Sequence, residues 1–447
     1  MSRLRIFDAA TFYAIFGRLV GSLSSFVTSF VLLYAVSPVT LGYYLVLASL
    51  TKTVSLVDLG MSLAVTQAVS HEYAHAKPDD AEIPDGVVNV MRYALRWYGV
   101  GAVTFVIVSW LFGYFYFLHD PGRAEIWPLK WMVTTGVLTA NIMIMPLLAA
   151  IEGALKVKSV YRYYTLTAIA SNIGAWICLF LGVGLWTPVV STAIALPFSV
   201  YMLGVEHGRF VGGILGRLRP SSGAASASPR DSFARFQWRL TISYAANYLS
   251  TWAVAPIALK LLGPVDSGRV GIVWTIGVGL FGAATLAVVV RQSVMGRLAA
   301  LGNYAELDRL VLTSGAVAVG LYLVSSLAFM GCVVVAHFMH WMLVQKLPGN
   351  QVIVMILLGF LMTVLTIPMS LYLRAHKSEP LMWAHVGYTM IFCTTLAVFS
   401  KWWGTLGFAG AFCLSVVLWL MPYTVIGFIA YRSHFIRQHS LKSGLVT

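Results

Sequence analysis

The sequence predicts an all-α integral membrane protein with about twelve transmembrane helices, arranged as two six-helix bundles around a central cavity. Its 447 residues are 59% hydrophobic and 10% charged, and the mean hydropathy is +0.81. Such a chain is too apolar for a soluble protein. Apolar runs long enough to cross a bilayer alternate with short polar connections. The expected spans are residues 11–36, 41–70, 93–118, 127–151, 163–183, 186–206, 237–262, 268–292, 310–337, 351–373, 381–400 and 404–430.

A stretch rich in Ser, Ala, Gly, Pro and Arg separates the sixth of these spans from the seventh. This composition is typical of a flexible linker. We therefore expect an N-terminal bundle over residues 1–206, a cytoplasmic linker over 207–236 and a C-terminal bundle over 237–447. The motif SPVTLG at 37–42 recurs as GPVDSG at 263–268, each time after the first helix of its half. The recurrence indicates a parallel duplication of six helices.

The distribution of basic residues predicts that both termini are cytoplasmic. With that orientation, most of the 30 Lys and Arg residues fall in cytoplasmic loops. The net charge of +14 then reflects orientation and anionic lipid, and we expect no nucleic-acid partner. The first span carries Arg18 and lacks a small-residue cleavage site, so it is interpreted as a retained helix. Four cysteines in apolar segments suggest neither a disulfide framework nor a metal site.

The first span carries a polar stripe. Arg18, Ser22, Ser25 and Ser29 are spaced i, i+4, i+7 and i+11, so they share one face of a helix. Apolar residues occupy the opposite face. We expect this stripe to line the cavity.

The second span repeats the arrangement with charged residues near its centre. On a continuous helix over 41–70, Lys52, Ser55 and Asp58 would share one face, and Leu, Val and Met residues would fill the other. A charge at the centre of a spanning helix costs about 2.5–3.5 kcal/mol, so such residues normally face water or a partner. Because the first two spans are antiparallel, Arg18 and Asp58 are expected at similar depth.

Two interpretations of these charges remain open at this point. Arg18 and Asp58 could form an ion pair that only holds two helices together, with Lys52 extending towards water. Alternatively, two cations against one acid could line a cavity that binds phosphate or another anion. The excess of cations favours the second interpretation, and Asp58 could then carry a coupling proton.

The C-terminal half has fewer internal charges. Asn247 belongs to a stripe with Arg239, Ser243 and Ser250 in the seventh span, and Arg291 closes the eighth span. We include Asn247 and Arg291 among the candidate substrate-binding residues, although a solvated helix end explains Arg291 equally well.

Enzymatic functions are disfavoured by the same sequence. His71-Glu72-Tyr73-Ala74-His75 satisfies the H-E-x-x-H pattern of zinc peptidases. However, Lys77 and Pro78 end any helix there and no third ligand is evident. A membrane glycosyltransferase, polymerase or ligase would need larger outer loops than this chain offers. We therefore expect a non-enzyme without cofactor or metal.

Several motifs resemble bacterial polysaccharide flippases of the MATE-like multidrug/oligosaccharidyl-lipid/polysaccharide exporter superfamily. The similar stretches are PVTLGYY at 38–44, VDLG at 57–60, QAVSHE at 67–72 and PLLAAIEG at 146–153, which a basic loop follows. The resemblance covers the whole chain in its expected architecture of twelve helices, two halves and a linker.

This resemblance implies a function and a location. The protein would flip an undecaprenyl-diphosphate-linked oligosaccharide from the cytoplasmic to the periplasmic leaflet by alternating access, for surface polysaccharide such as O-antigen or exopolysaccharide. It would reside in the bacterial inner membrane among its lipids, with coupling to protons or sodium and polysaccharide polymerase machinery as a partner. An ion-coupled multidrug or small-molecule antiporter of the same fold is the alternative, and cavity acids would favour it.

Overall fold

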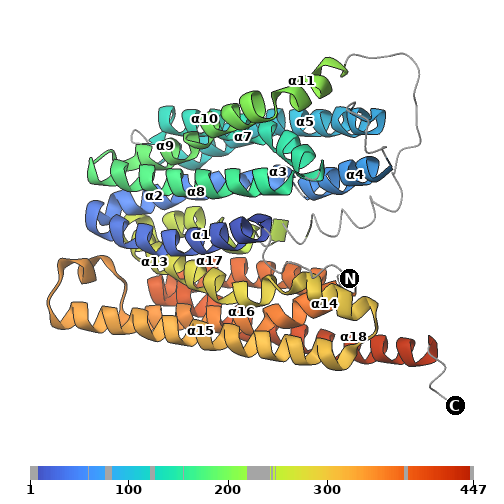
Figure 1. The fold of residues 1–447 in the computed structure, drawn as a ribbon. Helices are drawn as coiled ribbons and strands as arrows, with labels where there is room; N and C mark the ends of the chain where they lie inside the picture. Colours follow the sequence, from blue (N-terminus) through green and yellow to red (C-terminus); the bar gives the residue numbers. More distant parts are fainter. Residues whose placement is uncertain are drawn as a thin grey trace. The chain divides into compact units, whose positions relative to one another are not determined.

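Helices are the regular secondary structure of the part of the chain that the structure describes (Figure 1). This computed structural model describes residues 9–58, 60–75, 83–120, 126–154, 156–218, 242, 245–246, 248–376 and 381–442. Within these ranges no residue belongs to a β-strand.

The chain forms two compact units. Unit 1 comprises Met1–Gly21 and Leu47–Tyr244, and unit 2 comprises Ser22–Val46 and Ala245–Thr447. Helices α1 (Ala9–Ala35) and α2 (Pro38–Leu50) therefore contribute residues to both units. The bundle boundaries expected at 206 and 237 stay predictions. Of the expected linker, residues 208–216 form a helix, and residues 219–236 lie outside the described residues.

Unit 1 is built from spanning helices and from shorter helices at their ends. Thr66 Oγ1 on α4 donates a hydrogen bond to the Ala149 carbonyl on α7, 3.2 Å away, and Trp131 Nε1 on α7 donates to the Ser109 carbonyl on α5 at 2.9 Å. These bonds hold α4 and α5 to α7. The elements are the 3₁₀ turn η1 (Thr51–Thr53), α3 (Val54–Asp58), α4 (Met61–His75), α5 (Asp85–Phe117), α7 (Leu129–Gly153), α8 (Val157–Phe180), the 3₁₀ turn η2 (Gly184–Trp186), α9 (Thr187–Ala193), α10 (Ala195–Val200), the π-helix η3 (Tyr201–Glu206) and α11 (Gly208–Gly216).

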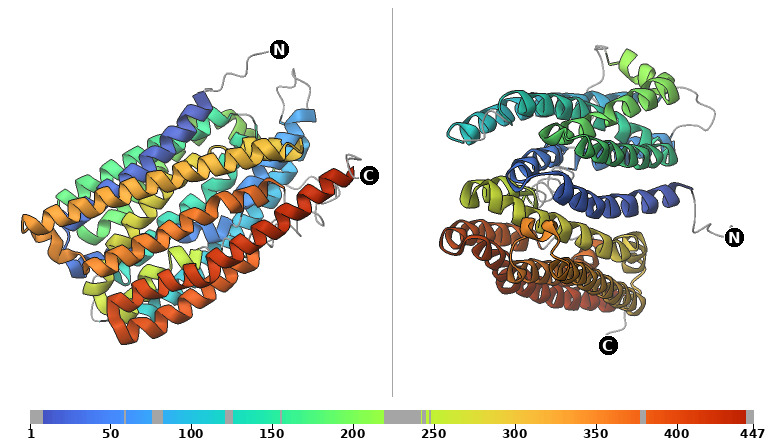
Figure 2. Two further views of the ribbon diagram at one scale, coloured as in Figure 1. Left: turned by 90° about the horizontal axis from the view of Figure 1, so that it is seen from below. Right: turned by 90° about the vertical axis from the view of Figure 1, so that its left-hand side faces the viewer.

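Unit 2 packs its long helices around an aromatic core. The ring of Trp274 lies 5.0 Å from that of Phe360 and 4.7 Å from that of Phe412, which joins three helices. Helix α16 also lies beside α15 and α18 (Figure 2). The elements are α13 (Val254–Val289), α14 (Gln292–Ala300), α15 (Tyr304–Phe338), the 3₁₀ helix η4 (Met342–Lys346), α16 (Asn350–Ala375), α17 (Met382–Ser415), the π-helix η5 (Val416–Leu420) and α18 (Met421–Lys442).

The expected all-α, twelve-helix membrane architecture is confirmed. In the described residues, nine helical runs are long and apolar enough to cross a membrane. Two of them, Tyr248–Ala299 and Met382–Ser433, have 52 residues each. Each would measure about 78 Å if straight, more than twice the ~30 Å hydrocarbon core of a bilayer. Each also contains a glycine with positive φ, Gly263 or Gly404, where two helices join. Counting these runs as two helices each and adding α1 gives twelve.

The expectation of one continuous helix over 41–70 is wrong. The hydroxyls of Thr51 and Thr53 donate to the carbonyls of Ala48 and Leu50, at 2.7 and 2.5 Å, and the chain there forms a 3₁₀ turn. Helix α3 then ends at Asp58, and Gly60 adopts a φ of +82° before α4 begins. Short polar side chains compete with helical hydrogen bonding in this way. The polar residues before Asp58 and those after Gly60 therefore do not lie on one continuous helix.

The two copies of the repeated motif contact one another inside unit 2. A Cβ atom on Gly268 would come within 2.5 Å of the Pro38 carbonyl oxygen, and a Cβ on Gly42 would approach the Pro264 carbonyl oxygen even more closely. The contact is reciprocal because Pro38 and Gly42 occupy the same motif positions as Pro264 and Gly268. The two π-helices, η3 and η5, also occur in the last expected span of each half.

Lys346 joins the C-terminal end of α1 to the rest of unit 2. Its ammonium group donates to the carbonyls of Leu33 and Val36, at 2.5 and 2.8 Å. Burial lowers the pKa of Lys346 from its usual value. A cation at a helix C-terminus satisfies carbonyls that have no partner within the helix and complements the helix dipole.

Candidate functional site

Asp58 caps α4 and binds α5. Its carboxylate accepts hydrogen bonds from the backbone N–H groups of Gly60 and Ser62, at 3.2 and 3.1 Å, and from the Ser62 hydroxyl. Tyr98 on α5, which is fully buried, donates its hydroxyl to the same carboxylate. Three of these four bonds are made to Oδ1 and one to Oδ2. The described partners of Asp58 are therefore structural ones.

Lys52 and Ser55 lie on the interrupted segment next to Asp58. Lys52 is in η1 and its side chain is exposed. The Ser55 hydroxyl donates to the Lys52 carbonyl at 2.8 Å, so it stabilises the local turn.

The other candidate residues are distributed over both units. The side chains of Arg18 and Ser22 on α1, and Asn247, lie outside the described residues. Ser25 is half-buried, and its carbonyl accepts from the Ser29 hydroxyl at 2.8 Å. Arg291 is exposed between α13 and α14, where its carbonyl accepts from the Met295 N–H at 2.9 Å. Among the candidate residues, one hydrogen bond joins Ser55 to Lys52, and the substrate site stays a prediction.

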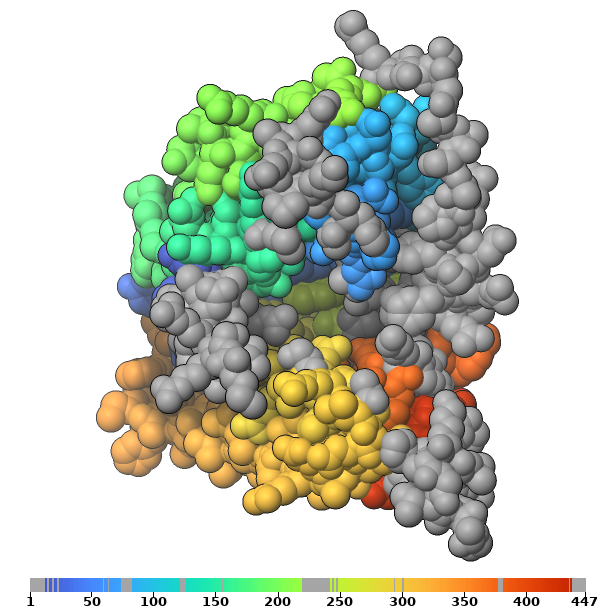
Figure 3. All heavy atoms as spheres, turned by 45° about the vertical axis from the view of Figure 1, so that its right-hand side comes forward, coloured from blue at the N-terminus to red at the C-terminus, as the bar shows by residue number. Residues whose placement is uncertain are grey.

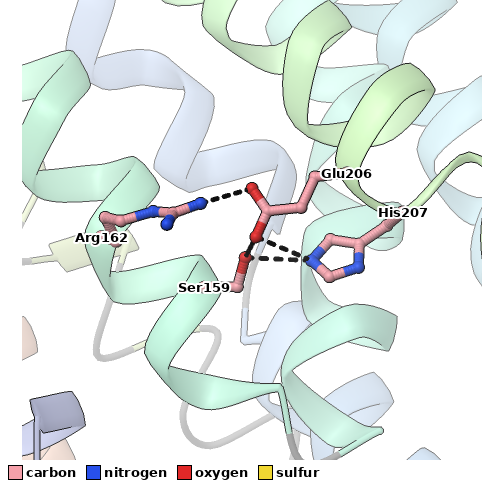
Figure 4. Close-up of polar contacts among 4 residues, drawn as sticks. All are labelled: Ser159, Arg162, Glu206 and His207. Carbon is pink, nitrogen blue, oxygen red and sulfur yellow. Dashed lines mark hydrogen bonds and ion pairs between the residues drawn. The ribbon is translucent and has the colours of Figure 1, made fainter.

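Sequence reasoning missed a second polar cluster, formed by Ser159, Arg162, Glu206 and His207 in unit 1 (Figure 4). Arg162 Nη2 lies 2.6 Å from Glu206 Oε2, and the Ser159 hydroxyl donates to Glu206 Oε1. His207 Nε2 lies 3.0 Å from Ser159 Oγ. Because the Ser159 proton is used by Glu206, His207 must donate from Nε2 to Ser159. All four polar groups are thereby linked around one carboxylate.

Two elements place these side chains. Ser159 and Arg162 are three residues apart on the first turns of α8, so they share a face. The π-helix η3 ends at Glu206, and the N–H of His207 bonds the Met202 carbonyl at 2.9 Å. The widened turn presents Glu206 and His207 side by side. Single π-turns of this kind are frequent at functional sites.

The cluster is electropositive apart from Glu206. Burial lowers the pKa of the His207 imidazole, and the nearby cations Lys156 and Arg162 add to the shift, whereas Glu206 opposes it. Lys156 also lies 5.3 Å from the centre of the Phe210 ring on α11. The sequence signal for this region was the basic loop before α8, which sequence reasoning used only for orientation and for the resemblance.

The H-E-x-x-H motif lies at the end of α4. Glu72 packs against Gly86 at the start of α5, where a Cβ atom would collide with its carboxylate. The His75 side chain and residues 76–82 lie outside the described residues. Among the residues that the structure describes, no three His, Cys, Asp or Glu side chains are grouped so as to hold a metal ion.

Comparisons with known proteins identify the fold. No family model matches the chain, and no curated protein matches it. A multidrug resistance MATE family transporter of the MOP superfamily, in an inward-facing conformation, has a TM-score of 0.59 at 16% identity, covering 96% of this chain and 97% of its own. The lipid II flippase MurJ, in an inward closed conformation, has a TM-score of 0.60 at 12% identity, covering 94% and 87%.

An outward-facing MATE family transporter is also similar, with a TM-score of 0.56 at 15% identity over 96% of this chain and 94% of its own. The protein is therefore a multi-pass membrane protein with the MATE-like fold. At these identities the likeness concerns the fold, and the site residues must distinguish between substrates.

Proposed function

We propose that this protein is a transporter that flips an undecaprenyl-diphosphate-linked oligosaccharide from the cytoplasmic to the periplasmic leaflet by alternating access, for surface polysaccharide biosynthesis. Its fold is that of MATE family transporters and of a lipid II flippase. A large lipid-linked anion and a small cationic drug place opposite demands on the charge of the site. The charges of the described residues are therefore the basis for choosing between these two substrates.

The position of Lys52 carries the proposal. Lys52 exposes its side chain within the apolar run Pro38–Asp58. An ammonium group in such a segment is costly unless it meets water or an anion. Asp58 accepts hydrogen bonds from Gly60, Ser62 and Tyr98. A cation at this position suits a diphosphate group better than a cationic drug.

A cation-coupled antiporter is the second candidate, and Glu152 favours it. Glu152 lies near the end of the apolar run Leu129–Gly153 and is half-buried. Tyr164 on α8 lies close enough to interact with it electrostatically. A carboxylate inside a spanning segment can bind a cation or a proton.

The test is a deletion strain complemented with variants at these two positions. Under the flippase proposal, deletion leaves lipid-linked oligosaccharide on the cytoplasmic face, where a periplasmic sugar-binding probe cannot reach it. Lys52→Ala should fail to restore surface glycan at normal protein level, Lys52→Arg should restore it, and Glu152→Gln should behave like wild type. Normal glycan in the deletion strain, with altered sensitivity to cationic drugs, would contradict the proposal and favour the antiporter.

We further propose an inner-membrane location with both termini cytoplasmic, and polysaccharide polymerase machinery as a partner. The excess of Lys and Arg in the loops assigned to the cytoplasm supports this orientation. Reporter fusions at each end test it, since a cytoplasmic fluorescent protein and a periplasmic phosphatase are active on opposite sides. Phosphatase activity at either terminus would contradict the orientation.

A further inference from the structure

The ends of α8 and η3 form an electropositive corner in unit 1, which we call the α8–α11 corner. It comprises the Ser159–Arg162–Glu206–His207 cluster together with Lys156, Lys158 and Arg209. The side chains of Lys156, Lys158 and Arg209 are exposed. Helix α11 follows this cluster directly in the sequence. In Figure 3 it is light green and lies at the surface of unit 1. One acid, Glu206, therefore stands among four permanent cations.

Glu206 occupies the position that an external anion would take. Arg162 binds one of its oxygens and Ser159 the other, while His207 Nε2 lies 3.7 Å from the second oxygen. A guanidinium and a hydroxyl bind this carboxylate, and the imidazole N–H binds the hydroxyl. Such a donor set suits phosphate oxygens. The carboxylate satisfies these donors in the absence of a ligand.

The charges around Glu206 exceed what it can neutralise. Helix α8 begins with Lys156 at its N-cap position, and its first turn contains no acidic residue. The N-terminal end of a helix carries a partial positive charge, so cations there are unfavourable unless an anion is nearby. Lys156 and Arg162 also act on the buried His207. The excess of positive charge points to a second anion from outside the chain.

The position of the corner indicates that this anion belongs to a lipid. Val157–Phe180 and Gly184–Glu206 are both candidate membrane spans, so Ser159 and Glu206 lie at the ends of spans, where headgroups are found. Large apolar side chains nearby are exposed, including Tyr201 at 58% and Val205 at 72%. Basic side chains at a membrane edge attract anionic headgroups, by about 1 kcal/mol each.

We propose that the α8–α11 corner binds the phosphate of an anionic lipid headgroup, and that Glu206 occupies this site when no lipid is bound. The site lies outside the set of Lys52, Ser55 and Asp58. Lipid binding there is expected whichever substrate the protein transports. Glu206 competes with the phosphate for Arg162, so removing its charge strengthens lipid binding.

The experiment titrates phosphatidic acid into the purified full-length protein in phosphatidylcholine-containing micelles, with bound lipid counted by native mass spectrometry. The variant Lys156→Gln/Lys158→Gln should bind phosphatidic acid more weakly, by about fivefold for each charge removed. Glu206→Gln should bind it more tightly, by a similar factor. Arg309→Gln, which removes an exposed charge from α15 in unit 2, is the matched control and should equal wild type.

Four results would overturn the proposal. Equal binding of phosphatidic acid and phosphatidylcholine would show that the phosphate is not recognised. Wild-type affinity in the double lysine variant would place the lipid elsewhere. Weaker binding by Glu206→Gln would show that Glu206 supports the site instead of competing for it. Displacement of phosphatidic acid by inorganic phosphate at equal concentration would assign the site to a soluble phosphate. If the double variant does not fold, Arg209→Gln replaces it with an expected fivefold loss.

Discussion

The contact between the two repeated motifs makes a quantitative prediction about helix packing in unit 2. Alanine at Gly42 would place its methyl group against the Pro264 carbonyl and within 2.8 Å of Ser267 Oγ, and alanine at Gly268 would meet the Pro38 carbonyl and, at 3.0 Å, the backbone nitrogen of Gly42. Backbone atoms cannot rotate away, so the helices must separate. Overpacking of this kind costs about 1–3 kcal/mol, and the gain in helix propensity from Gly to Ala returns about 1 kcal/mol.

We therefore expect each single variant to lose about 0–2 kcal/mol of stability relative to wild type, and about 1–3 kcal/mol relative to a Gly→Ala change that causes no collision. Gly320→Ala on α15, where a Cβ would meet nothing within 4 Å, is the matched control and should be neutral or slightly stabilising. The variants are ranked by apparent melting temperature in detergent at one fixed scan rate, because unfolding of such proteins is often irreversible.

The double variant Gly42→Ala/Gly268→Ala tests the reciprocal geometry. One separation of the two helices relieves both collisions, so the double variant should lose less stability than the sum of the single losses, with a coupling of about 1 kcal/mol. Strict additivity would mean that the two glycines do not share one contact. Single variants as stable as Gly320→Ala would refute the close approach itself.

Three further changes test single contacts. Lys346→Met removes the ammonium group that caps α1. Denaturant titration should show that the free energy of unfolding falls by about 1.5–3 kcal/mol. An equal loss in Lys346→Arg, which keeps the charge, would contradict the cap. Tyr98→Phe removes one bond to Asp58 and should cost about 1–2 kcal/mol in the same assay, whereas an unchanged midpoint would mean that this bond contributes nothing. Because the pKa of folded His207 is held below about 6.5, the unfolded chain binds its proton first, and stability falls as pH drops from about 6.5 towards the lowered value. The melting temperature of wild type should therefore fall more between pH 7.5 and 5.5 than that of His207→Gln, and equal falls would contradict this.

The helix count was predictable because it depends on segment composition alone. Apolar runs of bilayer length are strong signals, and the joins at Gly263 and Gly404 fall where polar or small residues interrupt them. The break within 41–70 was not predictable from periodicity. It depends on hydroxyl and carboxylate groups that bond to the backbone a few residues away, and the same residues would fit equally well on the polar face of a helix.

The polar clusters differ in how far the sequence could reveal them. Asp58 and Ser62 are local partners, but Tyr98 reaches them from another helix, and no spacing rule connects residues so far apart. The Ser159–Glu206 contact likewise joins the start of one span to the end of another. Both ends carry charged residues that are visible in the sequence, and only the fold brings the start of α8 and the end of η3 within hydrogen-bond distance.

The hydrogen bonds of Asp58 change how the charged residues of the second span are interpreted. On a continuous polar stripe, Lys52 and Asp58 would both line the cavity, and the charge of Asp58 could neutralise that of Lys52. Since Asp58 instead closes the N-terminal end of α4 and holds Tyr98, its charge serves the fold, whereas Lys52 lies on the preceding turn. If Asp58→Asn lowers protein stability while Lys52→Ala lowers transport at normal stability, the two charges have separate roles. If both variants lose transport and stability together, the original ion-pair interpretation of this region is the better one.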